Sequence, residues 1–368
     1  MRHRVRGHLL PLPIAAVPLA GTSIEIHKGA LKRMRRPRFG RLLVFLAVGV
    51  TATGLAACSS SSSNSTAVSG SGPEKTTVTV DVTDSPDAGP LWIAANDGFF
   101  KQQGLTVKLN YVPGTGAAFP AQAAHTVDFA EQNYVALFSE NQLKPQLGLR
   151  IIAPDEQAAP NTLVVMVPKN SPIKTAAGLK GKKIAFPAPG VNLSNLGIEE
   201  QLQGYGINPP TDFNDVIIGF SNEMAALKSG EVDAAFAIPP FVTIMETQIG
   251  AHQLVDLMTG PLNNIPSTGW TTTTYEEQHY PKTVAAFQRA ILQAQQVAAS
   301  NPTLVRSLLP SKVPNMTTKL ANIIALQTYV PTLSETSIQR VANVMEQFGV
   351  LKSKVNVSQL ITPPPAGA

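Results

Sequence analysis

From Thr76 onward, short apolar or β-branched segments alternate with longer segments of helical period, and this alternation limits the folds open to the chain. Residues 77–82, 105–111 and 127–130 have the composition of buried strands, whereas residues 91–103 have the period of a helix. A strand followed by a helix usually returns to the same sheet as a parallel neighbour. The pattern therefore predicts an α/β fold with helices flanking a mainly parallel sheet.

A second series of the same kind begins at residue 183. Strands are expected at 183–186, 216–219 and 232–237, with helices at 192–204 and 222–229. Past Trp270 the chain becomes mainly helical. The remaining expected elements are strands at 149–153 and 162–167 and helices at 281–300, 302–309, 319–328 and 337–348.

The two series contain similar Val-Asp strings. Residues 125–130 (HTVDFA) resemble residues 230–235 (GEVDAA), and each string follows a short Ala-rich helix. Coincidence between two short strings is the alternative explanation. We expect two α/β lobes, the first formed by residues 76–166 plus 270–368 and the second by residues 167–269.

Cys58 is the only cysteine of the 368 residues, and its surroundings are those of an export signal. It follows an apolar run at residues 42–55 and precedes the serine run 59–63. Basic residues at 35–41 come before the apolar run, which completes the pattern of a bacterial lipoprotein signal peptide. A transmembrane anchor is the alternative, although 14 residues fall short of the roughly 20 that span a bilayer as a helix.

We therefore expect residues 1–57 to be a signal segment, with Met34 as a candidate natural start. Cys58 would be lipidated, and residues 58–75 would form a Ser/Gly-rich tether. This arrangement predicts an extracytoplasmic protein that is anchored to the cell membrane by its lipid.

The basic residues concentrate in the export segment. The full chain has 29 Lys and Arg against 24 Asp and Glu. Residues 1–57 hold ten of these bases and one acid, so the rest of the chain has 19 bases, 23 acids and a net charge of −4. Nucleic-acid binding loses its electrostatic basis, and we expect none. With its one thiol lipidated, the domain also has no disulfide, so burial of a core must stabilise it.

Four motifs in order resemble the solute-binding proteins of ATP-binding-cassette importers. They lie at residues 90–107 (PLWIAANDGFF and, after two residues, QGLTV), 173–184 (IKTAAGLKGKKI), 226–240 (ALKSGEVDA to Pro-Pro) and 280–290. The nearest group is that for nitrate, sulfonate, taurine and thiamine precursors, which has the two-lobe periplasmic-binding-protein type II fold. Gly178 stands where this family usually has Asp. The resemblance implies a monomeric protein that captures a small nutrient and delivers it to an importer permease.

Ligands of open α/β sheets bind where loops follow the carboxyl ends of the strands. Some residues in these loops also fit other roles: Ser85 and Ser194 as helix caps, Gly114 and Gly116 in a tight turn, and Trp270 and Phe241 in the core. The candidate ligand-binding residues are Ser85, Asp87, Gly114, Thr115, Gly116, Glu131 and Asn133 in the first lobe, Asn192, Ser194 and Phe241 in the second, and Trp270 where the chain recrosses.

The charges in these loops bear on the ligand. None of the loops contains Lys or Arg, whereas Asp84, Asp87 and Glu131 are acidic. Helix N-termini and hydroxyls could still hold an anion. The balance nevertheless favours a neutral or weakly basic ligand over an anion.

Motifs for catalysis are missing from the sequence. His125, His252 and His279 show no metal-ligand spacing, and there is no nucleophile elbow or phosphate-binding loop. We therefore expect a binding protein without metal, cofactor or catalytic residues. The alternatives are an enzyme on the same two-lobe scaffold and a ligand-sensing subunit of a signalling system.

Overall fold

The computed structural model describes residues 72–112, 114–187, 196–197, 201–206, 212 and 214–367. The predicted export segment, the lipidation residue Cys58 and the candidate residues Asn192 and Ser194 lie outside these ranges, as does most of the predicted helix 192–204. No helix within the described ranges has the length and apolar character needed to cross a membrane.

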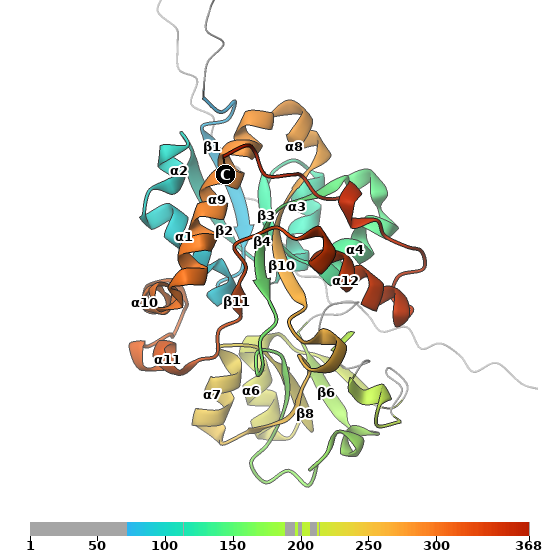
Figure 1. Ribbon diagram of the computed structural model, residues 1–368. Helices are drawn as coiled ribbons and strands as arrows, with labels where there is room; N and C mark the ends of the chain where they lie inside the picture. Colours follow the sequence, from blue (N-terminus) through green and yellow to red (C-terminus); the bar gives the residue numbers. More distant parts are fainter. Residues whose placement is uncertain are drawn as a thin grey trace, which may run out of the picture. The chain divides into compact units, whose positions relative to one another are not determined.

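The first sheet has six strands and is mixed, with two parallel and three antiparallel pairings, whereas a mainly parallel sheet was expected. β1 pairs in parallel with β2 and β3, and β10 runs antiparallel between β3 and β4. A short antiparallel strand, β11, lies at the edge beside β4. The strands are β1 (Thr77–Val82), β2 (Thr106–Tyr111), β3 (Phe129–Asn133), β4 (Leu149–Gln157), β10 (Pro266–Thr273) and β11 (Thr328–Tyr329), in the order β11-β4-β10-β3-β1-β2 (Figure 1).

Helices cover both faces of this sheet (Figure 1). On one face, helices pack with the strand residues Val78, Val80 and Phe129. On the other, they pack with Leu149 and Ile151 of β4. The first group is α1 (Gly89–Asn96), α2 (Phe99–Gln102), α9 (Pro281–Ser300) and α10 (Pro302–Lys312), and the second is α3 (Phe119–Ala123), α4 (Tyr134–Leu143) and α12 (Glu335–Gln347). α8 (Thr274–His279) precedes α9, and α11 (Thr318–Ile323) follows α10.

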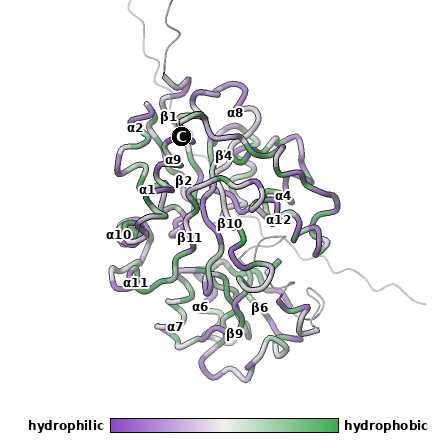
Figure 2. Tube along the Cα trace, in the orientation of Figure 1, coloured by the Kyte–Doolittle hydropathy of each residue, from purple (hydrophilic) through white to green (hydrophobic). Residues whose placement is uncertain are grey.

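The second sheet has five strands, of which β5 runs antiparallel to its neighbours β8 and β9. Its strands are β5 (Val164–Val167), β6 (Lys183–Phe186), β7 (Asn214–Ile217), β8 (Ala234–Ala237) and β9 (His252–Asp256), in the order β7-β6-β8-β5-β9. α6 (Phe220–Ser229) and α7 (Phe241–Ile249) pack on one face. The strands β5 and β8 at its centre are apolar and fully buried, whereas Figure 2 shows the outer helix α8 of the first sheet as hydrophilic.

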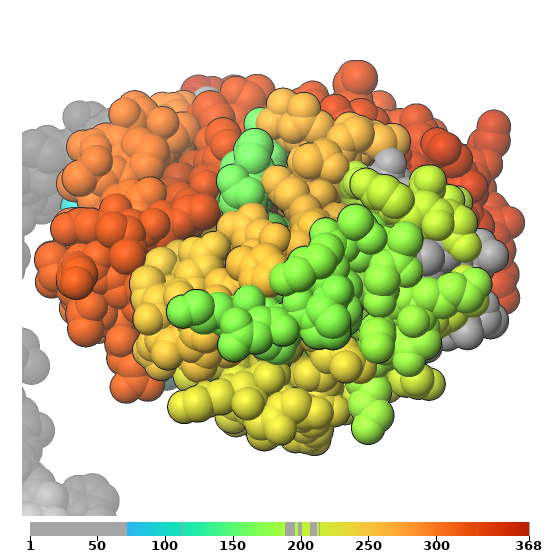
Figure 3. All heavy atoms as spheres, turned by 90° about the horizontal axis from the view of Figure 1, so that it is seen from below, coloured from blue at the N-terminus to red at the C-terminus, as the bar shows by residue number. Residues whose placement is uncertain are grey.

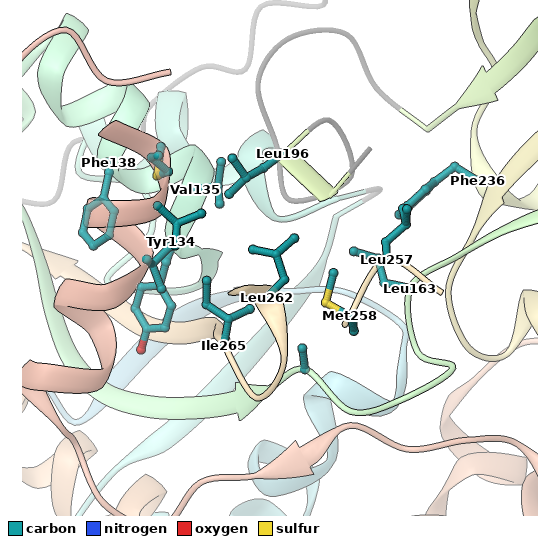
Figure 4. Packing of buried hydrophobic residues seen from close by; sticks show 14 of the residues in the cluster. Tyr134, Val135, Phe138, Leu163, Leu196, Phe236, Leu257, Met258, Leu262 and Ile265 are labelled. Carbon is teal, nitrogen blue, oxygen red and sulfur yellow. The ribbon is translucent and has the colours of Figure 1, made fainter. Parts of the chain in front are cut away.

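One apolar cluster joins the two sheets through the connection from β9 to β10. Leu257, Met258, Leu262 and Ile265 of that connection are buried, with at most 1% of their surface exposed. Figure 4 shows them between the α4 residues Tyr134, Val135 and Phe138 and the second-sheet residue Phe236. The sheets therefore share part of their core where the chain crosses between them.

A second region where segments of the two sheets approach each other is formed by helices. α7, which packs on the second sheet, lies beside the α10–α11 pair, which belongs with the first. Figure 1 and the view from below in Figure 3 agree on this arrangement.

The two ends of the described domain attach to the same short helix, α8. Lys75 Nζ donates to Glu276 Oε2 at 2.7 Å, and Thr362 Oγ1 donates to the neighbouring Glu277. In Figure 1 the C-terminus accordingly lies beside β1, at the end of the first sheet where residues 72–76 enter.

The predicted α/β class with two sheets is confirmed, and the strands 77–82 and 183–186 and the helix 281–300 have the predicted bounds. Two helix predictions were partly wrong. The helix predicted at 91–103 is interrupted because Gly98, at φ +76°, is in the left-handed conformation that ends a helix. The helix predicted at 319–328 ends at Ile323, and Thr328 begins a strand.

Sheet membership differs by a few residues from the expected lobe limits. β5 belongs to the second sheet, so the chain first crosses between Gln157 and Val164, whereas the expected limit was at residues 166 and 167. β10 begins in the first sheet at Pro266, ahead of the expected limit at residue 270. The strand signal at 162–167 does not by itself say which sheet the strand joins.

Candidate ligand-binding site

Hydrogen bonds connect the loop after β1 to the middle of β3. Thr83 donates from its backbone N and from Oγ1 to Glu131 Oε2, at 3.3 and 2.9 Å. The same hydroxyl lies 2.9 Å from Ser85 Oγ. Because β1 and β3 are parallel neighbours, their carboxyl ends meet at one edge of the sheet. The structure thus brings together two predicted site residues, Ser85 and Glu131.

Three further acidic residues lie around Glu131. Asp155 and Glu156 come from the end of β4, and like Glu131 they are at most 1% exposed. Asp87 precedes α1 and keeps a small exposed surface. The charge of Asp87 is close enough to act on the other three carboxyls. We call Asp87, Glu131, Asp155 and Glu156 the carboxyl cluster.

Burial raises the pKa of every member of the carboxyl cluster, because a charged carboxylate loses its hydration there. For Asp155, burial and then the charge of Asp87 raise the pKa to about 8. For Glu131 and Glu156, burial is again the larger cause, and the charges of Asp87 and Asp155 add to it, so the pKa rises well above its usual range. The cluster therefore retains protons at neutral pH.

Asp87 and Glu156 are close enough to act on each other. Their interaction raises the pKa of Glu156 further and opposes the rise for Asp87. Ser85 also opposes the rise of the Asp87 pKa. Ser85, Asp87 and Glu156 thus lie together as one polar group.

The two acids at the end of β4 differ in their other partners. Asp155 accepts from Thr268 Oγ1 at 3.0 Å and from Gln295 Nε2 at 2.7 Å. Within the described residues, no amide or hydroxyl donates to Glu156, and Glu131 Oε1 has no partner. The cluster therefore has acceptor oxygens that a ligand with N–H donors could satisfy.

Tyr134, at the start of α4, adds a buried hydroxyl that has no partner among the described residues. Tyr134, Glu156 and Thr268 line a cavity of about 30 Å³, which is large enough to hold a water molecule. The ring occupies space that only glycine leaves free at residue 269, because a Cβ at that position would lie 2.2 Å from the Tyr134 hydroxyl oxygen. Burial and the charge of Asp155 raise the pKa of Tyr134, so it is a neutral hydrogen-bond donor.

Asn133, Phe241 and Trp270 occupy structural positions in the described domain. Asn133 Oδ1 caps α4 by accepting from the backbone N of Val135 and Ala136, at 3.0 and 3.3 Å. Phe241 begins α7 and stacks on Phe220, with ring centroids 5.6 Å apart. Trp270 is fully buried, and its ring lies edge-on to Phe287. The carboxyl cluster is adjacent to Trp270, since Trp270 pairs with Glu131 across the sheet.

Gly114, Thr115 and Gly116 belong to the turn that leads into α3, and this turn packs against β1 and β3. Gly114 has φ −178°, an extended conformation that any residue adopts, and its Cβ position is open. The backbone geometry of this turn therefore does not require glycine at residue 114.

The sequence analysis missed Tyr134, Asp155 and Glu156. The acids follow the apolar residues 151–153 as part of the string PDEQ, at the carboxyl end of the predicted strand 149–153. The rule that selected the other loops would have found them, had the strand been followed to its polar end. In the described part of the chain, no group of three His, Cys, Asp or Glu has a geometry that could hold a metal ion.

Comparison with known proteins gives a family and a fold. The family model described as NMT1/THI5 like matches residues 85–304. A relative from Haemophilus influenzae that is named as a thiamine biosynthesis protein is 28% identical over 183 residues. That match covers 44% of the chain and 56% of the relative, so the chain spans little more than half of the relative's length.

Solved structures share the fold at low sequence identity. The alkanesulfonate-binding protein SsuA from Xanthomonas axonopodis pv. citri, bound to MOPS, has a TM-score of 0.66 at 17% identity, over 78% of this chain and 99% of its own. The periplasmic nitrate-binding protein NrtA from Synechocystis PCC 6803 has a TM-score of 0.63 at 17% identity, over 79% and 87%. A Candida albicans protein with the generic periplasmic-binding-protein fold has a TM-score of 0.64 at 16% identity, over 78% and 96%.

Proposed function

The chain belongs to the NMT1/THI5-like family, and from this premise we propose that it is a solute-binding protein that delivers a small organic nutrient to an importer permease. The fold shared with periplasmic binding proteins supports capture of a solute. The export pattern that ends at Cys58 supports an extracytoplasmic position on a lipid anchor. Two or more acyl chains on Cys58 would hold the protein stably at the membrane.

The carboxyl cluster carries our proposal for the ligand. Its four carboxyls lie at the carboxyl ends of the strands, and among the described residues no Lys or Arg forms an ion pair with them. A bound anion would add to the repulsion that already raises their pKa values. A neutral or weakly basic compound with N–H groups would instead donate to the free oxygens of Glu131 and Glu156. Amine-bearing heteroaromatic compounds, including thiamine precursors, have this chemistry.

Capture would proceed by closure of the two lobes on the ligand. A ligand shifts a conformational equilibrium only by the difference between its affinities for the two states. Residues of both lobes would contact the ligand only in the closed state, and the connections between the sheets would act as the hinge. The permease would then recognise the closed form.

Thermal unfolding of the purified protein with a panel of ligands tests the proposal. The panel pairs amino-substituted nitrogen heterocycles and amines with nitrate and alkanesulfonates at equal ionic strength. A ligand at 100 times its Kd stabilises a protein by about 2.7 kcal/mol, and we expect this effect only from the first group. Tighter binding of nitrate or a sulfonate would contradict the ligand proposal. Conversion of the bound compound into a product would contradict transport.

Variants in the cluster make the test specific. Glu131→Gln and Glu156→Gln should weaken binding of the active compound by roughly ten- to a hundred-fold, because each replaces an acceptor oxygen with an amide N–H group and so removes a hydrogen bond to the ligand. Glu223→Gln is the matched control, since Glu223 is also fully buried but lies on α6, which packs on the second sheet. Equal losses in all three variants would mean that the cluster has no special role in binding.

A further inference from the structure

A separate cavity of about 290 Å³ lies on the outer side of β11, between the end of α9, the start of α10 and β11. This volume is at the lower end of the range of small-molecule sites, about 300–1,000 Å³. The Tyr329 side chain lines the cavity, and its hydroxyl donates to the Pro86 carbonyl at 2.9 Å. Because Asp87 follows Pro86 directly, Tyr329 separates this cavity from the carboxyl cluster.

Arg306 on α10 gives the cavity its charge. Its Nη1 donates to the carbonyls of Ala321 and Ile324, both at 2.8 Å, which fixes the guanidinium at the end of α11. Both hydrogens of Nη1 are used in this way, so the N–H groups that remain for a ligand are those of Nε and Nη2. Among the described residues, Nε and Nη2 have no hydrogen-bond partner, and Arg306 forms no ion pair. This edge is the one that binds two oxygens of a carboxylate side by side.

Two further donors belong to the lining. Gln327 accepts from Ser267 Oγ through Oε1 at 3.0 Å, and its Nε2 has no partner within the described ranges. The Thr328 hydroxyl has none there either. Ala299 and Leu326 supply apolar walls, and none of the lining residues is acidic. The cavity thus combines one fixed positive charge and additional donors with apolar surface.

We propose that this cavity binds a small organic carboxylate. The two oxygens would accept from Nε and Nη2 of Arg306, and a short hydrocarbon chain would lie against Ala299 and Leu326. The site takes a monoanion, because Arg306 is the one positive group among its lining residues. It is distinct from the proposed nutrient site, whose free groups are acceptors.

The test uses the full-length protein with propionate or butyrate as the probe and sodium chloride at equal ionic strength as the control. Binding is followed by thermal unfolding and by the NMR signal of the Arg306 Nε–H group. We expect both probes to raise the Tm above that in sodium chloride and to shift this signal in a saturable manner. Equal stabilisation by sulfate or inorganic phosphate would overturn the carboxylate assignment, and absence of any saturable shift would overturn the site.

Two variants separate the site from a general effect of salt. Ala299→Leu fills the cavity and leaves the anchoring of Arg306 untouched, so it should fold and lose the response to butyrate. Arg306→Lys keeps the charge but removes the pair of parallel N–H donors, and should weaken butyrate binding by about tenfold or more. Arg340→Lys is the matched control, since Arg340 donates to the Asn263 carbonyl and is not part of the lining. A full response in Ala299→Leu would contradict the proposal.

The two proposals can fail independently. Ala299→Leu should bind the compound selected by the unfolding panel as tightly as the unmodified protein does. If this variant lost binding of both butyrate and the panel compound, the two sites would not be separate.

Discussion

Asp155 and Glu156 are neighbours in the sequence, but they differ in the groups that satisfy them. Asp155 has two donors, Thr268 and Gln295, whereas neither carboxyl oxygen of Glu156 has a hydrogen-bond partner among the described residues. Buried polar groups are normally hydrogen-bonded, because an unpaired group loses its hydration and gains no hydrogen bond in exchange. Glu156 is therefore a residue whose charge the ligand-free fold tolerates poorly, as expected where a ligand supplies the missing partner.

This difference predicts a pH dependence of stability. A carboxyl whose pKa is raised by folding binds more protons in the native state than in the unfolded state, so stability falls as pH rises between the two values. For Asp155 that window runs from about pH 4 to about pH 8. The ligand-free protein should have a higher Tm at pH 5.5 than at pH 8. A Tm that is the same at both values would mean that the cluster holds no protons.

Glu156→Gln should remove part of this dependence. The amide cannot ionise, so the variant should have a higher Tm than the unmodified protein at pH 8 and a similar Tm at pH 5.5. Glu231→Gln is the control, since Glu231 is exposed. Thermal unfolding at both pH values measures the effect, and a lower Tm for Glu156→Gln at pH 8 would contradict it.

Gly269→Ala should displace Tyr134. The new Cβ would lie 2.2 Å from the Tyr134 hydroxyl oxygen and 2.7 Å from Cζ, so the ring must move. Overpacking of this kind costs about 1–3 kcal/mol of unfolding free energy, and urea denaturation measures it. The double variant Gly269→Ala, Tyr134→Leu should show a smaller loss than the sum of the two single changes. Additive losses would mean that the two residues do not meet as described.

At the scale of elements, α9 is capped by a residue from outside its own sequence neighbourhood. Its N-cap residue, Tyr280, has no capping side chain. Instead, Glu74 accepts from the backbone N of Lys282 and Thr283, at 3.1 and 2.8 Å. Burial acts against ionisation of Glu74, but the backbone hydrogen bonds outweigh it and lower its pKa. The segment that follows the predicted tether is thereby fixed to the longest helix of the described fold.

Glu74→Ala should therefore lower the unfolding free energy by about 1 kcal/mol, the usual effect of a lost cap. It should also increase proteolysis before residue 76. The control is Glu140→Ala, which removes a surface pair with Lys144 four residues away and should cost no more than about 0.5 kcal/mol. Urea denaturation above pH 6, where Glu74 is ionised, compares the two. A similar small loss in both would mean that Glu74 does not act as a cap.

The helices and strands differ in how well the sequence predicts them. The bounds of α9 follow from a long amphipathic repeat that begins with proline. The strand β10 (PSTGWTTT) was missed because most of its residues carry hydroxyls, yet all of them are buried. Hydroxyls explain this: Thr271 and Thr272 donate to the carbonyls of Ala130 and Asp128, at 3.1 and 2.8 Å. A periodicity of hydropathy cannot detect a strand that satisfies its polar side chains through its neighbours.

The sequence predicts only those residues of the candidate site that follow a clearly marked strand. Ser85, Asp87 and Glu131 follow strands that the sequence marks clearly, so the rule for parallel sheets brings them together. Asp155 and Glu156 belong to a strand whose polar end continues past its apolar run, and Tyr134 depends on the packing of α4 against Gly269. Such contacts between distant segments are set by tertiary structure.

At the scale of the whole molecule, the lipid anchor and the binding domain should be separable. Cys58→Ser removes the thiol that would be lipidated, while the carboxyl cluster lies entirely in the described domain. The variant should leave the membrane fraction and bind the same compound with unchanged affinity. Cell fractionation and thermal unfolding measure the two properties. A variant that remains in the membrane fraction would contradict the lipoprotein interpretation.

The attachment of both described ends to α8 has a consequence for protein engineering. Lys75 and Thr362 bind the adjacent residues Glu276 and Glu277, so a short linker could join the two ends without disturbing the fold. New ends could then be opened at the exposed turn between Lys169 and Asn170, which follows β5. Such a circular permutant would carry a fluorescent reporter on the second lobe, where lobe closure would change its signal.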